Sequence, residues 1–313
     1  MSNLSVPHFH NEEAAYAYVE ARVWPQGPIC PHCGGYERIS KMGGKSTRIG
    51  TYKCYQCRKP FTVKVGTIFE ASHVPMRHWL QAMYLMAASK KGISANQLHR
   101  TLGCTLKTAW FLAHRIREAM ATGALDPFGS GGTAVEADET FFGDDPDMPS
   151  PTKHTRVHNK NKIVTLVDRA SGRARSFVVD RLNTATITAI VSENVAKEAH
   201  LMTDEAHHYI TVGRTLASHG VVRHRAEEYV RDGDPKIHSN TVEGFYSIFK
   251  RGMRGVYQHA SKKHLHRYVA EFDFRYSNRI ALGVNDIART DTLLAGVVGK
   301  RLTYRTAREQ AAR

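Results

Sequence analysis

Four of the five cysteines in this 313-residue chain form two Cys-x-x-Cys pairs, Cys30 with Cys33 and Cys54 with Cys57, and twenty residues separate the pairs. This spacing is typical of a zinc site in which two short turns each supply two thiolates. The strand-like segments TYKC and PFTVKV complete a zinc-ribbon pattern. Disulfides or unused thiols are the alternatives, and disulfides are rare in a reducing compartment. The pattern predicts a structural Zn²⁺ held by all four cysteines.

The chain carries a large excess of positive charge. Its 44 lysines and arginines against 29 acidic residues give a formal net charge of +15. Such a charge favours polyanionic partners, with nucleic acid first and an anionic membrane second. No apolar run approaches the roughly 20 residues that span a bilayer, and the polar, acidic N-terminal segment is unlike a signal peptide. We therefore expect a DNA-binding protein of the reducing cytoplasm with no membrane partner.

Hydrophobic periodicity divides the chain into four parts. Residues 1–72 combine a short helix with the zinc ribbon, and residues 73–122 are helical. A glycine-rich stretch at 122–133 is the clearest domain boundary. Within 134–279, a strand hairpin followed by alternating strands and helices predicts an α/β domain with a mixed sheet. Residues 280–313 form a helical C-terminal tail that either packs on a core or mediates assembly.

The helical region 73–122 has the rhythm of a helix-turn-helix with its break at Gly103. The second helix, about residues 105–120, is then the one that enters the DNA groove. An ordinary helical hairpin packed against its neighbour is the alternative. In a basic chain, directly after a zinc ribbon, DNA binding is the preferred interpretation. The residues expected to contact DNA from this helix are Lys107, Arg115 and Arg117.

Three acidic residues are placed for metal-dependent chemistry. Asp138 and Asp204 each close a short apolar run that is predicted to be a strand, and Glu243 lies on a predicted helix. Strand-end carboxylates gather at one edge of an α/β sheet. Together with the glutamate they can hold two Mg²⁺ or Mn²⁺ ions, which suit phosphodiester displacement. Residues 144–161 have no apolar periodicity and are expected to form a loop close to Asp138.

The stretch 237–255 contains the predicted helix that carries Glu243, and this helix also carries cations. Glu243 and Lys250 fall on one helical stripe, opposite an apolar stripe that would face the core. Asn240 or Thr241 can cap the helix start. We expect Lys250 to anchor the phosphates that flank the reacting bond. The basic residues expected to contact DNA from this helix are Lys250, Arg251 and Arg254.

Each acid taken alone can also be an ordinary turn or surface residue without a role in metal binding, because turns favour aspartate. Spacing alone does not decide among neighbouring acids, since Glu136 and Glu139 flank Asp138 and Glu205 follows Asp204. Alternation along a strand places Glu136 and Asp138 on one face and Glu139 on the other. We prefer Asp138 as the acid nearest the edge of the sheet.

The chain resembles bacterial insertion-sequence transposases of the ISXO-like class, which join an N-terminal zinc ribbon to an RNase-H-like DDE domain. The matching segments are CPHCGG…YKCYQCRKPFTVKVGTIFE, VEADETFFG, LMTDEAHHY and HSNTVEGFYSIFKRGMRGVYQHASKKHLHRYVAEFDFRYSNR. The resemblance implies an RNase-H-like fold over 134–279. It also implies that Asp138, Asp204 and Glu243 are the metal-binding catalytic triad and that Lys250 is the basic residue this group shows in the same helix.

The resemblance implies an activity and its partners. Transposases of this class cut at the terminal inverted repeats of their element with Mg²⁺ and join the free 3′-hydroxyl to target DNA. The expected partners are therefore the element ends, the target DNA and further copies of the chain, at the bacterial nucleoid. A DNA-binding regulator that has lost catalysis and a nuclease that cuts without joining are the alternatives. The intact acids favour an enzyme, because carboxylates in a basic cleft repel phosphate.

Overall fold

The computed structural model describes residues 2–121, 126–148, 159–223 and 230–303. The chain forms two compact units: unit 1 is Met1–Ala121 with Val284–Arg313, and unit 2 is Thr122–Gly283. Parts of three predicted segments lie outside the described residues, namely 122–125 of the linker, 149–158 of the loop and 304–313 of the tail. Among the described residues, no helix combines the length and the apolar character that crossing a bilayer requires.

The ribbon of unit 1 is a three-stranded antiparallel sheet. Its strands are β1 (Ile39–Lys41), β2 (Tyr52–Cys54) and β3 (Pro60–Phe61), in the order β1-β2-β3. Beside it, the Trp24 ring meets the Tyr52 and Phe61 rings edge-on, with centroids 5.5 and 5.8 Å apart. So few apolar side chains leave a sheet of this size marginal without a further cross-link.

Helices make up the rest of unit 1. The short turns η1 (Asn3–Ser5) and η2 (Pro7–Phe9) lead into α1 (Glu12–Val23), and α2 (Met76–Ala88), α3 (Ala95–Leu102) and α4 (Leu106–Met120) follow the ribbon. From the C-terminal region, α9 (Asp286–Ala295) packs against α1, α2 and α4. Arg289 Nη1 donates to Ala87 O at 3.0 Å. The described part of the tail thus completes the core of unit 1.

Unit 2 is built on a five-stranded mixed sheet in the order β6-β5-β4-β7-β8. The strands β4 (Ala134–Asp144), β5 (Lys160–Asp168) and β6 (Arg173–Val179) are antiparallel, whereas β7 (His200–Thr203) and β8 (Ser218–Val221) run parallel to β4. The predicted hairpin turns at Gly172, whose φ of +65° suits glycine. The mixed α/β domain that the sequence predicts is confirmed.

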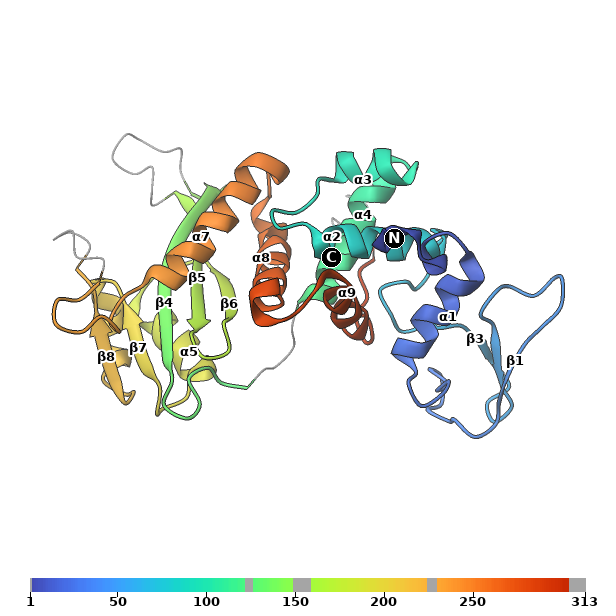
Figure 1. Cartoon of the computed structure of the whole chain (residues 1–313), viewed down its shortest axis with the longest axis horizontal. Helices are drawn as coiled ribbons and strands as arrows, with labels where there is room; N and C mark the ends of the chain where they lie inside the picture. The colour runs from blue at the N-terminus through green and yellow to red at the C-terminus, as the bar shows by residue number, and fades with distance from the viewer. Residues whose placement is uncertain (1, 122–125, 149–158, 224–229, 304–313) are drawn as a thin grey trace. The chain divides into compact units, whose positions relative to one another are not determined.

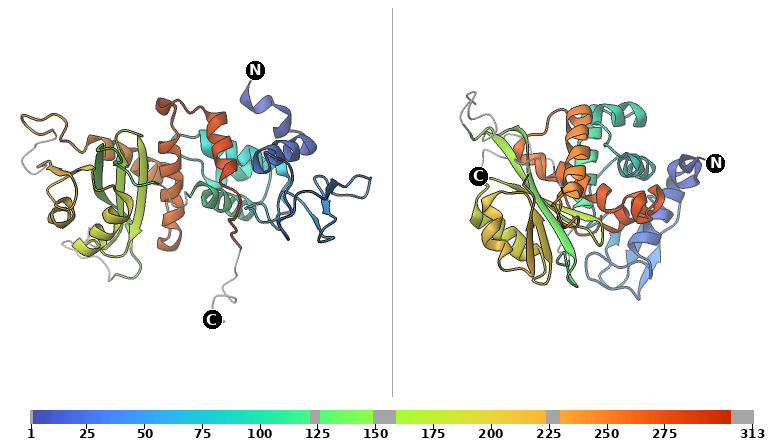
Figure 2. Two further views of the ribbon diagram at one scale, coloured as in Figure 1. Left: turned by 90° about the horizontal axis from the view of Figure 1, so that it is seen from below. Right: turned by 60° about the vertical axis from the view of Figure 1, so that its left-hand side comes forward.

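Helices cover both faces of this sheet (Figure 1). One face packs against α5 (Thr184–Asn194) with the short η3 (His207–Tyr209) and α6 (Ile210–Gly213). The other packs against α7 (Asn240–Gly252) and α8 (Lys262–Ser277), joined by the π-helical turn η5 (Met253–Tyr257), and η6 (Ile280–Leu282) follows. Figure 2 shows the yellow α5 and the orange α7 on opposite sides of the strands. The core of unit 2 therefore has two apolar layers.

Helix α8 is fastened to β6 through the buried carboxyl group of Asp273. Its two oxygens accept hydrogen bonds from Ser176 N at 2.8 Å and from Ser176 Oγ at 2.6 Å. Burial is the largest influence on this group and raises the pKa of Asp273 to about 7, although the Ser176 bonds and the charge of Arg175 act in the opposite direction.

We expect Asp273→Asn to remove a loss of stability that wild type suffers as pH rises. The folded pKa exceeds the ordinary value of about 3.9, so this group's contribution is fully present below about pH 4 and is lost as pH rises through about 7. Denaturant unfolding from about pH 4 to 8 should therefore shift in favour of the variant by on the order of 4 kcal/mol. A difference that stays constant over this range would contradict the assignment.

Candidate functional site

The four predicted zinc ligands converge in unit 1. One sulfur atom from each of Cys30, Cys33, Cys54 and Cys57 lies within 4.8 Å of all the others. The Cys30–Cys57 and Cys33–Cys54 sulfur pairs are 3.6 and 3.7 Å apart. Tetrahedral coordination with Zn–S bonds of about 2.3 Å places sulfurs about 3.8 Å apart. All four are free thiols, so the cluster fits the structural Zn²⁺ that the spacing predicts.

The turns around these cysteines place backbone N–H groups beside one of the sulfurs, that of Cys54. Residues Gly34 and Arg58, each directly after the second cysteine of a pair, both have positive φ, at 74° and 62°. In the second turn, the backbone N–H of Cys57 is the largest influence on Cys54. With the N–H of Gln56, it lowers the pKa of the Cys54 thiol to about 7. The thiolate is the form that binds zinc.

The first predicted catalytic acid, Asp138, lies in the middle of β4, which corrects the prediction that the strand ends there. The strand continues to Asp144 because residues 139–142 pair with β5. By contrast, β7 stops at Thr203, and its last pair with β4 joins Glu136 to Met202. Asp138 and Asp204 each follow that pair by two residues on neighbouring parallel strands. They therefore lie side by side at the point where β7 ends.

Local hydrogen bonds hold both aspartates. Asp138 Oδ1 accepts from Glu139 N at 2.7 Å, and Asp204 Oδ1 accepts from Ala206 N at 3.0 Å. From α7, Tyr246 Oη donates to the backbone oxygen of Asp138 at 2.6 Å. A hydrogen bond thus connects α7, the helix that carries Glu243, directly to Asp138.

The third acid, Glu243, lies in the first turn of α7, and Ser239 Oγ donates to its Oε1 at 3.0 Å. The apolar side of α7 packs on the sheet as predicted, with Phe245 and Phe249 buried. On the predicted polar stripe, the half-buried Lys250 places Nζ 6.0 Å from the Tyr246 ring centroid. Farther along, the remaining predicted cations Arg251 and Arg254 are exposed.

The charges of these acids act on one another. Burial is the main reason that the pKa of Asp138 is raised well above its usual range. The negative charges of Glu139, Asp204 and Glu243 raise it further, while the Glu139 N–H bond lowers it. The predicted triad is therefore within electrostatic reach. Among the described residues, the four cysteines are the sole group of three or more His, Cys, Asp or Glu side chains that are gathered closely enough to hold one ion.

Glu139 points to the opposite face of the sheet, as alternation along β4 predicts. Its Oε2 accepts from Tyr209 Oη at 3.0 Å and lies 3.4 Å from His208 Nε2. Both partners come from η3, which begins three residues after Asp204. Glu139 thus fastens the segment that follows β7.

Glu136 caps the start of α7, which differs from the predicted cap at Asn240 or Thr241. Asn240 and Thr241 are the first two residues of the helix, and the N-cap residue Ser239 makes no side-chain cap bond. Instead, the backbone N–H groups of Thr241 and Val242 donate to Glu136 Oε2 at 2.8 and 2.9 Å. Alternation placed Glu136 on the correct face, but no local pattern links a strand residue to a helix about one hundred positions later.

In unit 1, the helix pair predicted to bind DNA is present as α3 and α4. The first helix ends at Gly103, with φ of 64°, and Thr105 Oγ1 caps the second by accepting from Thr108 N at 3.2 Å. Lys107 is exposed at the start of α4. These features are compatible with the predicted DNA contact of Lys107 at the start of α4.

Two of the α4 residues that were predicted to contact DNA have buried side chains, which differs from the solvent-facing position that the prediction assumed. Arg115 is 6% exposed and Arg117 is 2% exposed. The Arg115 guanidinium donates to the backbone oxygens of Ile68 and Glu70 at 2.9 and 2.8 Å, and to Leu302 O at 3.0 Å. Arg115 therefore joins loops inside unit 1, and its predicted phosphate contact has no support in this arrangement.

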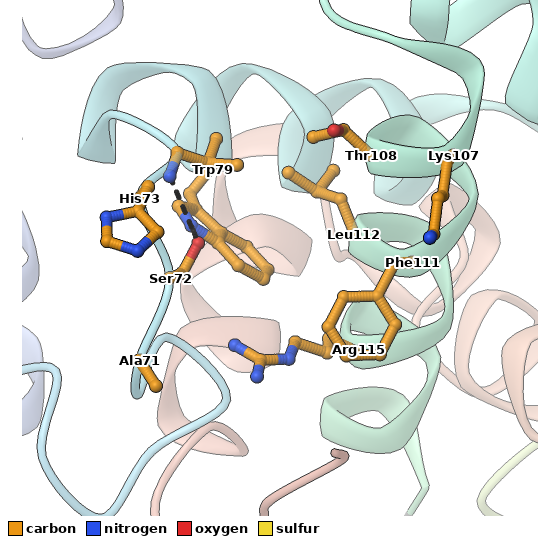
Figure 3. A pocket seen from close by; sticks show the side chains of 10 residues that line it. Ala71, Ser72, His73, Trp79, Lys107, Thr108, Phe111, Leu112 and Arg115 are labelled. Atoms are coloured by element: carbon orange, nitrogen blue, oxygen red, sulfur yellow. Dashed lines mark hydrogen bonds between the residues drawn. The ribbon is translucent and has the colours of Figure 1, made fainter. Parts of the chain in front are cut away.

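A cavity of about 350 Å³ lies beside α4 (Figure 3). Trp79 of α2 forms one wall, and Lys107, Phe111 and Arg115 line the wall that α4 provides. The Arg115 guanidinium lies over the Phe111 ring, 4.7 Å from its centroid. Its charge is thus held against the protein interior, whereas Lys107 remains exposed.

Comparison with known proteins relates both units to transposase families. Residues 130–277 match the ISXO2-like transposase domain, and residues 10–60 match the transposase zinc-ribbon domain. The chain is 27% identical over 289 residues to an uncharacterized protein in the transposable element ISH50 of Halobacterium salinarum. That alignment covers 87% of this chain and 93% of the relative.

A much weaker likeness links the chain to a solved structure, the simian T-cell lymphotropic virus intasome in complex with the PP2A regulatory subunit B56 gamma. The TM-score is 0.29 and the identity 14%, over 63% of this chain and 65% of that one. A superposition this poor does not establish a shared fold.

Proposed function

Because this chain belongs to the ISXO2-like insertion-sequence transposases, we propose that it binds the terminal inverted repeats of an insertion sequence, cleaves the DNA there and joins the ends to target DNA. The observation that carries this proposal is that Asp138 on β4 lies beside Asp204 at the end of β7. Glu243 on α7 is within electrostatic reach of Asp138. Carboxylates grouped at the end of a strand in an α/β sheet are a common setting for ligand binding.

Unit 2 is the catalytic domain in this proposal and has an RNase-H-like fold. The antiparallel β4–β5–β6 hairpins on one side of the sheet and the parallel β7 and β8 on the other support this assignment. In this arrangement the longest strand carries Asp138, and the shorter neighbouring strand ends beside it.

The donor set fits Mg²⁺ or Mn²⁺, because both bind carboxylate oxygens. Asp138, Asp204 and Glu243 would hold the ions. Bound there, the cations would activate the attacking oxygen and stabilise the leaving oxygen of the phosphodiester. Burial is the main cause of the raised pKa of Asp138, and repulsion from the negative charges of Glu139, Asp204 and Glu243 raises it further. Bound cations would offset this repulsion, so metal binding should stabilise unit 2.

The remaining residues bind and orient DNA. Lys250 shares a helical stripe with Glu243, and Arg251 and Arg254 continue the basic surface into η5. In unit 1, α3 and α4 act as a helix-turn-helix that presents Lys107, next to the zinc ribbon in sequence. Joining two element ends requires two of them to be held at once, so we propose that copies of the chain assemble on DNA.

We expect Lys250→Ala to weaken binding of the element end and to flatten its salt dependence. Each phosphate contact adds about 0.9 to the slope of log affinity against log salt concentration. Losing one contact should reduce that slope by about 1. Lys263→Ala, which removes the same charge from an exposed position on α8, is the control and should leave the slope nearer that of wild type. Equal slopes for wild type and Lys250→Ala would remove the proposed contact.

The proposed function is tested by incubating the protein with Mg²⁺ and labelled DNA that carries the element's own ends. We expect cleavage at the ends followed by joined products, and neither with scrambled ends. Cleavage without joining would support the nuclease instead. Binding without cleavage would support a DNA-binding regulator.

A further inference from the structure

We propose that Glu136 is a positioning residue of the metal site: it fixes the start of α7 on β4 and so sets the place of Glu243 relative to Asp138. The proposal rests on the proposed function, because it assigns a role in holding the catalytic cations. It makes metal affinity depend on a carboxylate that does not itself contact the metal.

Each carboxylate oxygen of Glu136 receives two hydrogen bonds. Oε2 accepts from the backbone N–H groups of Thr241 and Val242 at 2.8 and 2.9 Å. Oε1 accepts from Thr241 Oγ1 at 2.7 Å and from Arg169 Nε at 2.5 Å. The side chain is completely buried. With both oxygens so occupied, Glu136 is excluded as a further metal ligand, although it lies only two residues from Asp138.

The capped residues lie directly beside the acid that they position. Val242 precedes Glu243, and Glu136 precedes Asp138 by two residues, or about 6.8 Å along a strand. The contact between Glu136 and the first turn of α7 therefore sets the position of Glu243 on α7 relative to Asp138 on β4. The second fastening is the bond from Tyr246 Oη to Asp138 O at 2.6 Å. Together, the two contacts oppose movement of α7 along β4 and away from it.

Arg169 extends the same contact to the chain that enters α7. Its guanidinium donates to the backbone oxygens of Lys236 and His238 at 2.5 and 2.7 Å, in addition to Glu136. The cation and the N-terminal end of the helix both compensate the buried negative charge. His238 Nδ1 lies 3.3 Å from Glu136 Oε1. Burial, and then the charge of Arg169, lower the pKa of His238, which favours the neutral imidazole there.

The test compares Mn²⁺ binding and α7 protection in the full-length protein. Glu136→Gln keeps the size of the side chain but removes its charge and turns one acceptor into a donor that faces other donors. We expect faster amide hydrogen exchange over residues 237–246. We also expect Mn²⁺ affinity, measured by titration with detection of free Mn²⁺, to fall by about tenfold or more, as it does when groups that support metal ligands are removed.

The matched control is Glu271→Gln. Glu271 is an equally buried carboxylate of unit 2, ion-paired with Arg275 on α8. It should lower the unfolding temperature and leave Mn²⁺ affinity at the wild-type value. Arg169→Lys, which retains the charge but cannot reach all three acceptors, is a second variant if Glu136→Gln does not fold, and it should weaken Mn²⁺ binding in the same direction.

The outcomes separate this inference from the function on which it rests. Wild-type Mn²⁺ affinity in folded Glu136→Gln or Arg169→Lys would overturn the positioning role alone. Equal weakening in Glu271→Gln would overturn it too, because the effect would then follow general destabilisation. Absence of Mn²⁺ binding by wild type would overturn both proposals.

Discussion

Replacing Asp138 with asparagine should abolish metal-dependent cleavage and, without metal, make unit 2 more stable. Catalytic cations contribute several kcal/mol to such reactions, so the rate should fall by about a thousandfold or more. Stability should rise because wild type buries a carboxylate near Glu139, Asp204 and Glu243, and all three raise its pKa. A destabilising catalytic group is expected where function and folding place opposite demands on one side chain.

The pH dependence of the free energy of unfolding tests why Asp138→Asn should stabilise unit 2. Because the folded pKa of Asp138 is raised, its favourable contribution is present below about pH 4 and is lost as pH rises. The stability gained by Asp138→Asn should therefore be larger at neutral pH than at about pH 4. Mg²⁺ should raise the unfolding temperature of wild type but not of the variant. Wild-type cleavage by Asp138→Asn would remove Asp138 from the site.

Removing zinc should unfold the ribbon of unit 1 while unit 2 remains folded. The three short strands bury few apolar side chains: Phe61 is buried, and Tyr52 and the neighbouring Trp24 are partly buried. Structural zinc typically contributes on the order of 10 kcal/mol or more to the folding of such sites. Chelation, or Cys54→Ser, should therefore abolish the cooperative melting of the ribbon together with its bound zinc.

Cys104→Ser is the matched control for the zinc experiment, because Cys104 lies outside the four-cysteine cluster. It should retain wild-type zinc content and melting. An unchanged melting curve after complete zinc removal would show that the ribbon is held by its aromatic contacts alone. Loss of the ribbon should also weaken DNA binding if this part of unit 1 contacts the element end.

Local spacing was enough to predict the zinc site. Four ligands in two tight turns define a tetrahedral site almost independently of the rest of the chain. The mixed α/β class was equally accessible, since the hairpin and the strand–helix alternation are local patterns. The three acids of the proposed metal site were predicted from the same elements together with the family resemblance. What their spacing could not show was how the strands extend and pair.

The predictions that differ from the structure concern features that residues far apart in the sequence determine. The end of β4 is set by the residues of β5 that pair with it, so Asp138 falls within a strand and not at its end. The start of α7 is capped by Glu136 from β4, which no rule based on adjacent residues predicts. On α4, charge suggested a solvent-facing surface, but Arg115 finds its partners in loops far away in sequence.

The central claim is that Asp138, Asp204 and Glu243 form one metal site that performs both cleavage and joining. The most direct measurement compares wild type with Glu243→Gln in a Mg²⁺-dependent strand-transfer assay on labelled element ends. Glu205→Gln serves as the control, because it neutralises the acid next to Asp204. We predict joined products with wild type and the control, and bound but uncut DNA with Glu243→Gln. Joined products from Glu243→Gln at the wild-type rate would contradict the claim.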